Sequence, residues 1–448
     1  MPDIRYIVVS DLHLGAHTSL LTALTPDGRV DPSRPSEPLA SLAAALRELV
    51  AANEGPEKPV LVLNGDVIEL ALATTNVAVT CFQRFLEALM PAGQPPIFSR
   101  VVYLPGNHDH HVWKAAREQQ YCAEVMRLQP GGSLPQVPHI TPLLGAAPVR
   151  AALLDTLAGV DRLGVPMDVV YPNLALRSAS GRRLVVIHHG HFLEPLYSAM
   201  SQLLGALIPD RQPPRTVAEL EADNGAWIDF FWSSMGSSGN VGPDVAVLYE
   251  KLQSKEQTRK LKPNGVFTSL ETFLFDRVLA PIALPLLDFF RGRSDQDLTE
   301  EERRGLCAYL SGPLRRQILD EVGPVPPSVA FVFGHTHRAF ARALDVPGFA
   351  QPVEIFNTGG WVVDAPAPEP LNGASMLLVS EDLEIAPVRL YADTVDLARV
   401  EVPESTQPFQ QRMAKLLDGT RWQAFARAAR PAVEQRREGL AHNVSRAI

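Results

Sequence analysis

The side chains best suited to chemistry in this sequence are histidines, aspartates and one asparagine that follow short apolar runs. Nine of the 12 histidines lie in four short clusters. The clusters, with one Gly-Asp pair, are Asp11-Leu12-His13, Gly65-Asp66, Gly106-Asn107-His108-Asp109 (continued by His110 and His111), His188-His189-Gly190-His191 and Gly334-His335-Thr336-His337. Each follows a run that predicts a β-strand. Because loops after the strands of an α/β sheet converge at one edge, these side chains are expected to form a metal site.

The mixture of donors indicates which metals fit. Two carboxylates with several imidazoles are too rich in nitrogen for calcium or magnesium alone. The three cysteines are too few and scattered for a thiolate zinc cluster. A pair of transition ions such as Mn, Fe or Zn suits the set. The sequence lacks the His-Glu-x-x-His, phosphate-loop and Gly-x-Ser-x-Gly motifs, so metal-activated water is the expected nucleophile.

Strand and helix patterns alternate along the first 110 residues and predict an α/β sheet with buried strands. Strands are predicted at Arg5–Val9, Val60–Leu63 and Arg100–Leu104, and helices at Leu39–Ala52 and Val79–Met90. Further strands are predicted at Asn173–Ser178, Arg183–Ile187, Val329–Phe333, Val353–Phe356, Ser375–Val379 and Pro387–Tyr391, with a short helix around Val149–Ala158.

The stretch from Phe192 to Ser328 has a helical pattern and interrupts the predicted strands. Helices are expected at Leu196–Leu207, Val245–Leu261, Leu270–Phe290 and Thr299–Glu321. Both ends of the stretch adjoin histidine clusters, so we expect a helical cap over the site. Its aromatic residues either form their own core or line a groove for an apolar substrate group. Its arginines either bind anions or are solvated: Arg211, Arg215, Arg291 and Arg293.

The C-terminal segment differs in charge from the rest of the chain. Residues 407–448 contain 8 basic and 3 acidic residues, whereas the whole chain has a net charge of −9. The segment is interpreted either as a helix pair packed on the body with a solvated basic face, or as a docking surface for an acidic partner or a membrane.

Composition excludes several classes of protein. With 46% hydrophobic and 20% charged residues over 448 positions, the chain can bury a sizeable core. In the most apolar region, Val266–Phe290, the longest charge-free run is Val278–Leu287, which is too short for a membrane span. The N-terminus does not resemble a secretory signal. We therefore expect a soluble, cytoplasmic protein. Its acidic balance argues against nucleic acid as a partner.

Together the five motifs resemble those of the calcineurin-like metallophosphoesterases. All five occur in the order of that family, and each follows a predicted strand. The resemblance covers Met1–His191 and Val329 to about Val400. It implies a β-sandwich flanked by helices (αββα). The chain is then divided into a core (residues 1–191 and 329–402), a helical insertion or cap (192–328) and a C-terminal helical extension (403–448).

The resemblance also implies a site for two divalent transition-metal ions. Residue by residue, Asp11, His13 and His337 would hold one ion, Asn107, His189 and His335 would hold the other, and Asp66 would bridge them. Two cations about 3.5–4 Å apart can clamp the entering and leaving oxygens of an in-line displacement.

Further roles are predicted for residues within or next to these motifs. His108 resembles the family's acid, next to the phosphate or the leaving oxygen, and Asp109 is expected to orient it. His189 is preferred to His188 as a ligand because the family's ligand precedes the glycine. His191 either contacts the substrate or lies behind the ligands.

The resemblance implies hydrolysis of phosphate mono- or diesters by a metal-bound hydroxide. The alternative within enzymes is a pyrophosphatase acting on a nucleotide- or lipid-linked substrate. A different class is a catalytically inactive scaffold of the same fold, which binds partners through the insertion and the basic tail.

Overall fold

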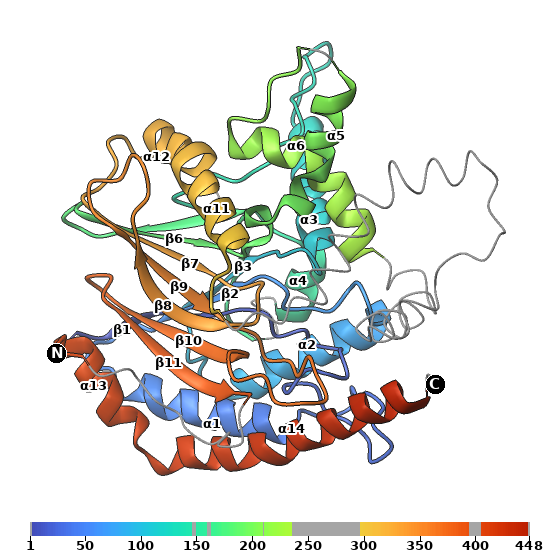
Figure 1. Cartoon of the computed structure of the whole chain (residues 1–448), viewed down its shortest axis with the longest axis vertical. Helices are drawn as coiled ribbons and strands as arrows, with labels where there is room; N and C mark the ends of the chain where they lie inside the picture. The colour runs from blue at the N-terminus through green and yellow to red at the C-terminus, as the bar shows by residue number, and fades with distance from the viewer. Residues whose placement is uncertain are drawn as a thin grey trace.

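The computed structural model describes residues 2–145, 149–158, 163–208, 210–234, 296–393 and 405–446. Its centre is a pair of β-sheets packed face to face, with helices against the outer face of each sheet (Figure 1). This confirms the αββα arrangement predicted from the sequence.

The first sheet has six strands in the order β11-β10-β1-β2-β3-β4. They are β1 (Ile4–Val9), β2 (Val60–Asn64), β3 (Arg100–Leu104), β4 (Met167–Val169), β10 (Gly373–Ser380) and β11 (Ile385–Ala392). Strands β1 to β4 run parallel, so their connections must cross the sheet, and they contain helices. The helices are α1 (Glu37–Ala51), α2 (Thr75–Leu89), α3 (His110–Met126) and α4 (Ala152–Ala158). Helix α1 begins at Ser36, whose hydroxyl accepts the amide of Leu39.

The second sheet has five strands in the order β5-β6-β7-β9-β8. They are β5 (Asn173–Arg177), β6 (Arg183–His188), β7 (Ser328–Phe333), β8 (Ala339–Leu344) and β9 (Val353–Thr358). Strands β6, β7 and β9 are parallel, and β5 and β8 are antiparallel edges. Between the sheets, inward side chains such as Val62, Val185 and Val332 form a buried core. The alternate side chains of each strand face the helical layers, as the two-residue period of a strand requires.

All the predicted strands are present, whereas several other elements were not predicted. The elements missed were α3, the three-residue strand β4, the edge strand β8 and α6 (Val217–Ile228). Helix α3 buries few of its 17 residues, and the middle of β8 is exposed. Neither segment therefore has the apolar periodicity on which the predictions rested.

Part of the insertion forms the helical layer on the second sheet. Helices α11 (Glu300–Tyr309) and α12 (Arg315–Glu321), joined by a π-helical turn, pack on its outer face (Figure 1). Helix α5 (Ala199–Leu207) packs on α6, and the π-helical turn that continues α6 contacts α3. The helices predicted at Val245–Leu261 and Leu270–Phe290, with Arg291 and Arg293, lie outside the described residues. The cap over the site therefore stays a prediction.

The C-terminal segment is helical and packs against the first sheet's helical layer. Helices α13 (Pro408–Leu417) and α14 (Thr420–Arg446) bury Phe409, Trp422 and Phe425, and α14 runs along α1 (Figure 1). This confirms the helical tail; whether its exposed arginines meet a partner stays a prediction. Across the described ranges, none of the helices is long and apolar enough to cross a membrane.

Candidate metal centre

The predicted site residues come together where strands of both sheets end. Strands β1, β2 and β3 of one sheet and β6 and β7 of the other lead directly into them. Two hydrogen bonds join the two sheets at this edge: Asn64 Nδ2 donates to the His188 carbonyl (3.1 Å), and the His335 amide donates to Asp11 Oδ1 (2.9 Å). Within the second sheet, the Gly334 amide donates to the His189 carbonyl (2.8 Å) and ties the ends of β6 and β7 together. The edge is thus one connected structure built from five strand ends.

Left-handed backbone conformations are concentrated at the candidate ligands. Of the seven described non-glycine residues with positive φ, five are candidate ligands: Asp11 (52°), His13 (44°), Asp66 (50°), His335 (68°) and His337 (56°). Such conformations cost on the order of 1–3 kcal/mol each and persist only where the surroundings hold them, typically at functional sites. The strain is an indication of function that does not depend on any sequence motif.

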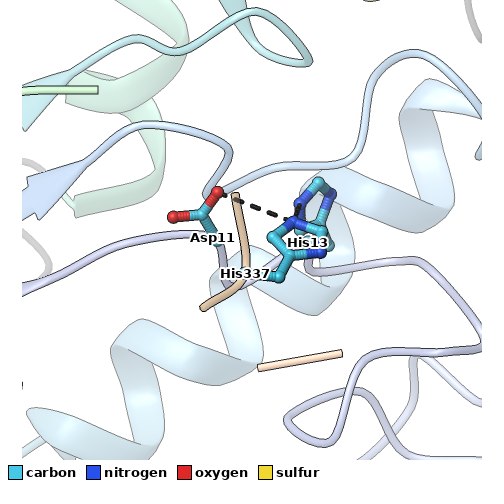
Figure 2. A group of neighbouring side chains, drawn as sticks. All are labelled: Asp11, His13 and His337. Atoms are coloured by element: carbon cyan, nitrogen blue, oxygen red, sulfur yellow. Dashed lines mark hydrogen bonds and ion pairs between the residues drawn. The ribbon is translucent and has the colours of Figure 1, made fainter. Parts of the chain in front are cut away.

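Asp11, His13 and His337 form the first set of converging donors (Figure 2). Their potential ligand atoms all lie within 4.8 Å of one another. His13 Nε2 is 3.2 Å from His337 Nε2, which is 3.7 Å from Asp11 Oδ1. The other carboxylate oxygen, Asp11 Oδ2, is buried and has no hydrogen-bond partner among the described residues. This is the set that the resemblance assigned to one ion.

Asp66, His189 and His335 form the second set, also with ligand atoms within 4.8 Å of one another. His189 Nε2 lies 3.2 Å from Asp66 Oδ2 and 3.0 Å from Asn107 Oδ1. The amide of Asn107 donates to Tyr197 Oη (3.2 Å), which leaves its oxygen facing the histidine. Asp66 Oδ2 is also 3.8 Å from His13 Nε2, so this carboxylate lies between the two sets.

Three of the four candidate histidine ligands have one ring nitrogen hydrogen-bonded to an oxygen atom behind the site, and the fourth has a carboxylate oxygen nearby. The hydrogen-bonded pairs are His13 Nδ1 with Glu69 Oε2 (2.8 Å), His337 Nδ1 with Asp364 Oδ2 (2.9 Å) and His189 Nδ1 with the Asn64 carbonyl (3.1 Å). His335 Nε2 lies 3.4 Å from Glu194 Oε1, which is an ion-pair distance. A ring nitrogen that donates to oxygen fixes the tautomer, so the opposite nitrogen carries a lone pair. Metal-ligating histidines in proteins are held in this way.

The electrostatics of the site favour cations. Burial alone would favour neutral rings, but neighbouring carboxylates outweigh it: Asp66 and Asp11 raise the pKa of His189, and Asp364 and Asp11 that of His337, each to about 9. If His13 and His337 are neutral, two lone pairs face each other across 3.2 Å. A divalent cation would relieve this repulsion and replace the bound protons. The residues present therefore fit metal ions.

The two remaining histidines of the His188-His189-Gly190-His191 motif are buried behind the ligands. His188 packs among the rings of Tyr309 and Phe331, away from Asp66, and burial lowers its pKa well below the usual value. This supports the choice of His189. His191 is also fully buried, and its Nε2 lies 3.1 Å from Tyr171 Oη. Substrate contact by His191 is therefore not supported by its position.

His108 is oriented by Glu69 rather than by Asp109, which corrects the sequence prediction. His108 Nδ1 lies 2.9 and 3.0 Å from the two Glu69 oxygens. The fully buried Asp109 carboxylate instead accepts the amides of Asp66, Val67 and Gly106 and the Tyr103 hydroxyl. Asp109 thus shapes the loops that carry Asp66 and Asn107. Although burial opposes the charge, Glu69 and Asp66 raise the pKa of His108 to about 10.

Sequence reasoning missed three carboxylates that lie against site histidines: Glu69, Glu194 and Asp364. Glu69 was detectable, because it follows Asp66 by three residues and shares its loop. It contacts both His13 and His108 and forms a third group of potential donors with them. Glu194 and Asp364 have no local signal, because nothing in their neighbourhoods indicates which histidine they meet.

A buried polar network joins the insertion to the segment that follows Asp109. His110 Nε2 contacts Glu221 Oε1 (3.0 Å), and the hydroxyl of Tyr171 donates to Glu221 Oε2 (2.9 Å). Asp229 lies 3.9 Å from the other nitrogen of His110. A Cβ on Gly225 would lie 2.2 Å from the Glu221 carboxylate, so the helix leaves room for this acid. The sequence analysis had no basis for this network, because α6 was not predicted.

Glu221→Ala is expected to lower the free energy of unfolding by about 3–5 kcal/mol, because it leaves the buried, charged His110 without its carboxylate partner. Burial opposes the charge on His110, but Glu221 and Asp229 raise its pKa from 6.5 to about 9. The pairing of protonated His110 with these carboxylates therefore stabilises the fold fully below pH 6.5, and this contribution is lost as the pH rises through about 9. Urea unfolding at several pH values, with the exposed Glu118→Gln as control, would measure it. A loss that is independent of pH would contradict the assignment.

Comparison with known proteins agrees with the geometry. Residues 4–226 match the family model described as calcineurin-like phosphoesterase. No curated protein matches the chain. The match includes the first four motifs, and β7 adds the fifth to the same edge. Family membership implies a metal-dependent phosphoesterase in general terms and binding of divalent metal ions. By its sequence match and its fold, the chain belongs to the calcineurin-like phosphoesterase family.

Proposed function

We propose that this chain hydrolyses phosphate mono- or diesters at a pair of divalent transition-metal ions. The observation that carries the proposal is the orientation of three histidines, His13, His189 and His337, each hydrogen-bonded to an oxygen behind it while its opposite nitrogen is left for a metal. Left-handed backbone at five of the candidate ligands supports it further. A scaffold without activity has no need of this arrangement.

The candidate ligands divide into two groups around one shared carboxylate. Asp11, His13 and His337 hold the first ion, Asn107, His189 and His335 hold the second, and Asp66 serves both. When bound, the ions supply a water activated at neutral pH and neutralise the oxygens of the phosphate.

His108 is the residue that donates a proton to the leaving group. Its Nδ1 is held by Glu69, which leaves Nε2 to donate to the phosphate or to the leaving oxygen. As the ester bond breaks, the Nε2 proton passes to the leaving oxygen. His108 is also the more exposed member of this pair, with 20% of its side chain accessible against 1% for Glu69.

Metal analysis of the purified chain is the first test. We expect two transition ions per chain, loss of activity with a chelator, and recovery with added Mn²⁺. Hydrolysis of p-nitrophenyl phosphate and bis-p-nitrophenyl phosphate would separate monoesterase from diesterase.

Other outcomes would redirect the proposal. Cleavage of a nucleotide-linked pyrophosphate without cleavage of either ester would favour the pyrophosphatase alternative. A folded chain with neither metal nor turnover would contradict the proposal and favour the inactive scaffold.

A further inference from the structure

We propose that the C-terminal helix α14 holds one half of the metal centre in place through Arg436 and Arg437. The inference rests on the proposed metal site and concerns residues far outside the family match. The helix contacts neither ion position directly. Arg436 holds the loop that follows Asp11 and His13, and Arg437 is linked to His337 through a chain of polar contacts, so both are positioning residues for the first ion.

Arg436 is bound to the loop that follows His13. Its guanidinium, on a side chain only 4% exposed, donates to the carbonyls of Ser19 (2.8 Å), Thr22 (2.6 Å) and Ala432 (2.8 Å). All three acceptors are backbone oxygens. A charged side chain is buried at a cost, so this contact fixes the loop to the helix. Burial also lowers the pKa of Arg436 to about 10.

Ser19 transmits this contact to the first motif. Its hydroxyl donates to the carbonyl of Leu12 (2.6 Å), the residue between Asp11 and His13. The amide of Trp361 donates to the Asp11 carbonyl (3.0 Å), and the Trp361 ring packs edge-on against Phe425 of α14. The strained backbone at both ligands is therefore supported from the helix side.

Arg437 leads to the remaining ligand of the first ion. It pairs with the buried Asp393, whose carboxylate accepts the Glu369 amide (3.2 Å) and whose own amide donates to the Asn372 carbonyl (2.9 Å). The side-chain amide of Asn372 contacts Asp364 Oδ2 (3.3 Å), the oxygen that holds His337 Nδ1. A continuous chain of polar contacts thus runs from α14 to His337.

The second ion position is supported by the insertion instead. Tyr197 contacts Asn107, and Glu194 contacts His335, and both precede α5. Because the two halves of the centre have different supports, a change in α14 should weaken one ion and spare the other. A general loss of stability would affect both.

The test measures Mn²⁺ affinity by calorimetry in two backgrounds of the full chain. His189→Ala leaves the first ion position, and His337→Ala leaves the second. In the first background, Arg436→Met is expected to weaken Mn²⁺ binding about tenfold or more, the range for partners that orient ligands. In the second background, the affinity should stay within about twofold of its parent, below that range.

Matched variants distinguish positioning from stability. Arg430→Met makes the same exchange at an exposed position of α14 and should change nothing. Val433→Ala loosens the packing of the same helix without touching the loops, so it should lower the melting temperature but not the Mn²⁺ affinity. If Arg436→Met does not fold, Arg436→Lys and Arg437→Met carry the same test.

Equal weakening in both backgrounds, or none in either, would overturn the inference and leave the proposed function standing. Absence of Mn²⁺ binding by the unaltered, folded chain would overturn the proposed function and the inference with it.

Discussion

Asp66→Asn is expected to reduce phosphoester hydrolysis by more than about a hundredfold and to leave fewer than two ions bound. The Asp66 carboxylate lies between the two sets of donors, 3.2 Å from His189 Nε2 and 3.8 Å from His13 Nε2. Asparagine keeps the shape but removes the charge that two cations share. Loss of a partner that only orients a ligand costs about 10–100-fold, so loss of the shared ligand should exceed that range. Metal analysis and turnover of the same preparation would measure both effects.

Asp168→Asn is the matched control, because it neutralises another buried carboxylate of the same sheet. Asp168 lies on β4 and pairs with Arg100 and Arg150, away from the candidate ligands. It should keep both ions and near-normal turnover. If Asp66→Asn also kept two ions and full activity, Asp66 would not be the shared ligand.

Local sequence was sufficient to predict the residues that build the framework of the site. Runs such as Val60–Leu63 are apolar on both faces, since the strand is buried between a helical layer and the second sheet. The polar residues directly after such runs must lie at the sheet edge. All five motifs obey this rule, so the sequence predicts that the two sets of donors are neighbours, and the fold does bring each set together.

The supporting residues could not be predicted, because they act over long separations in the chain. Asp364 lies 27 residues from His337, and Arg436 lies 417 residues from Ser19. Their partners depend on how whole elements pack, which no local pattern records. The prediction that Asp109 orients His108 failed for the same reason. Asp109 is the carboxylate nearest to His108 in the sequence, but it accepts hydrogen bonds from backbone amides, and Glu69 contacts His108 instead.

His108→Ala is expected to slow turnover about 10²–10⁴-fold while both ions stay bound. The ring is held by Glu69 through Nδ1 and belongs to neither set of candidate ligands, although its backbone amide donates to Asp66 Oδ1 (2.8 Å). Alanine keeps that amide and removes only the ring. The loss should therefore fall on kcat rather than on metal content, and it should be greatest for substrates with poor leaving groups, which depend most on a proton donor.

The comparison that decides the role of His108 is with Asp66→Asn and with His111→Ala. His111 is a neighbouring histidine on α3 with 53% of its side chain exposed, and its contact is with Asp229. Its removal should leave turnover nearly unchanged. If His108→Ala lost metal to the same extent as Asp66→Asn, the ring would be part of the metal site and not the proton donor. Retained metal with normal turnover on every substrate would contradict the role of His108 as the proton donor.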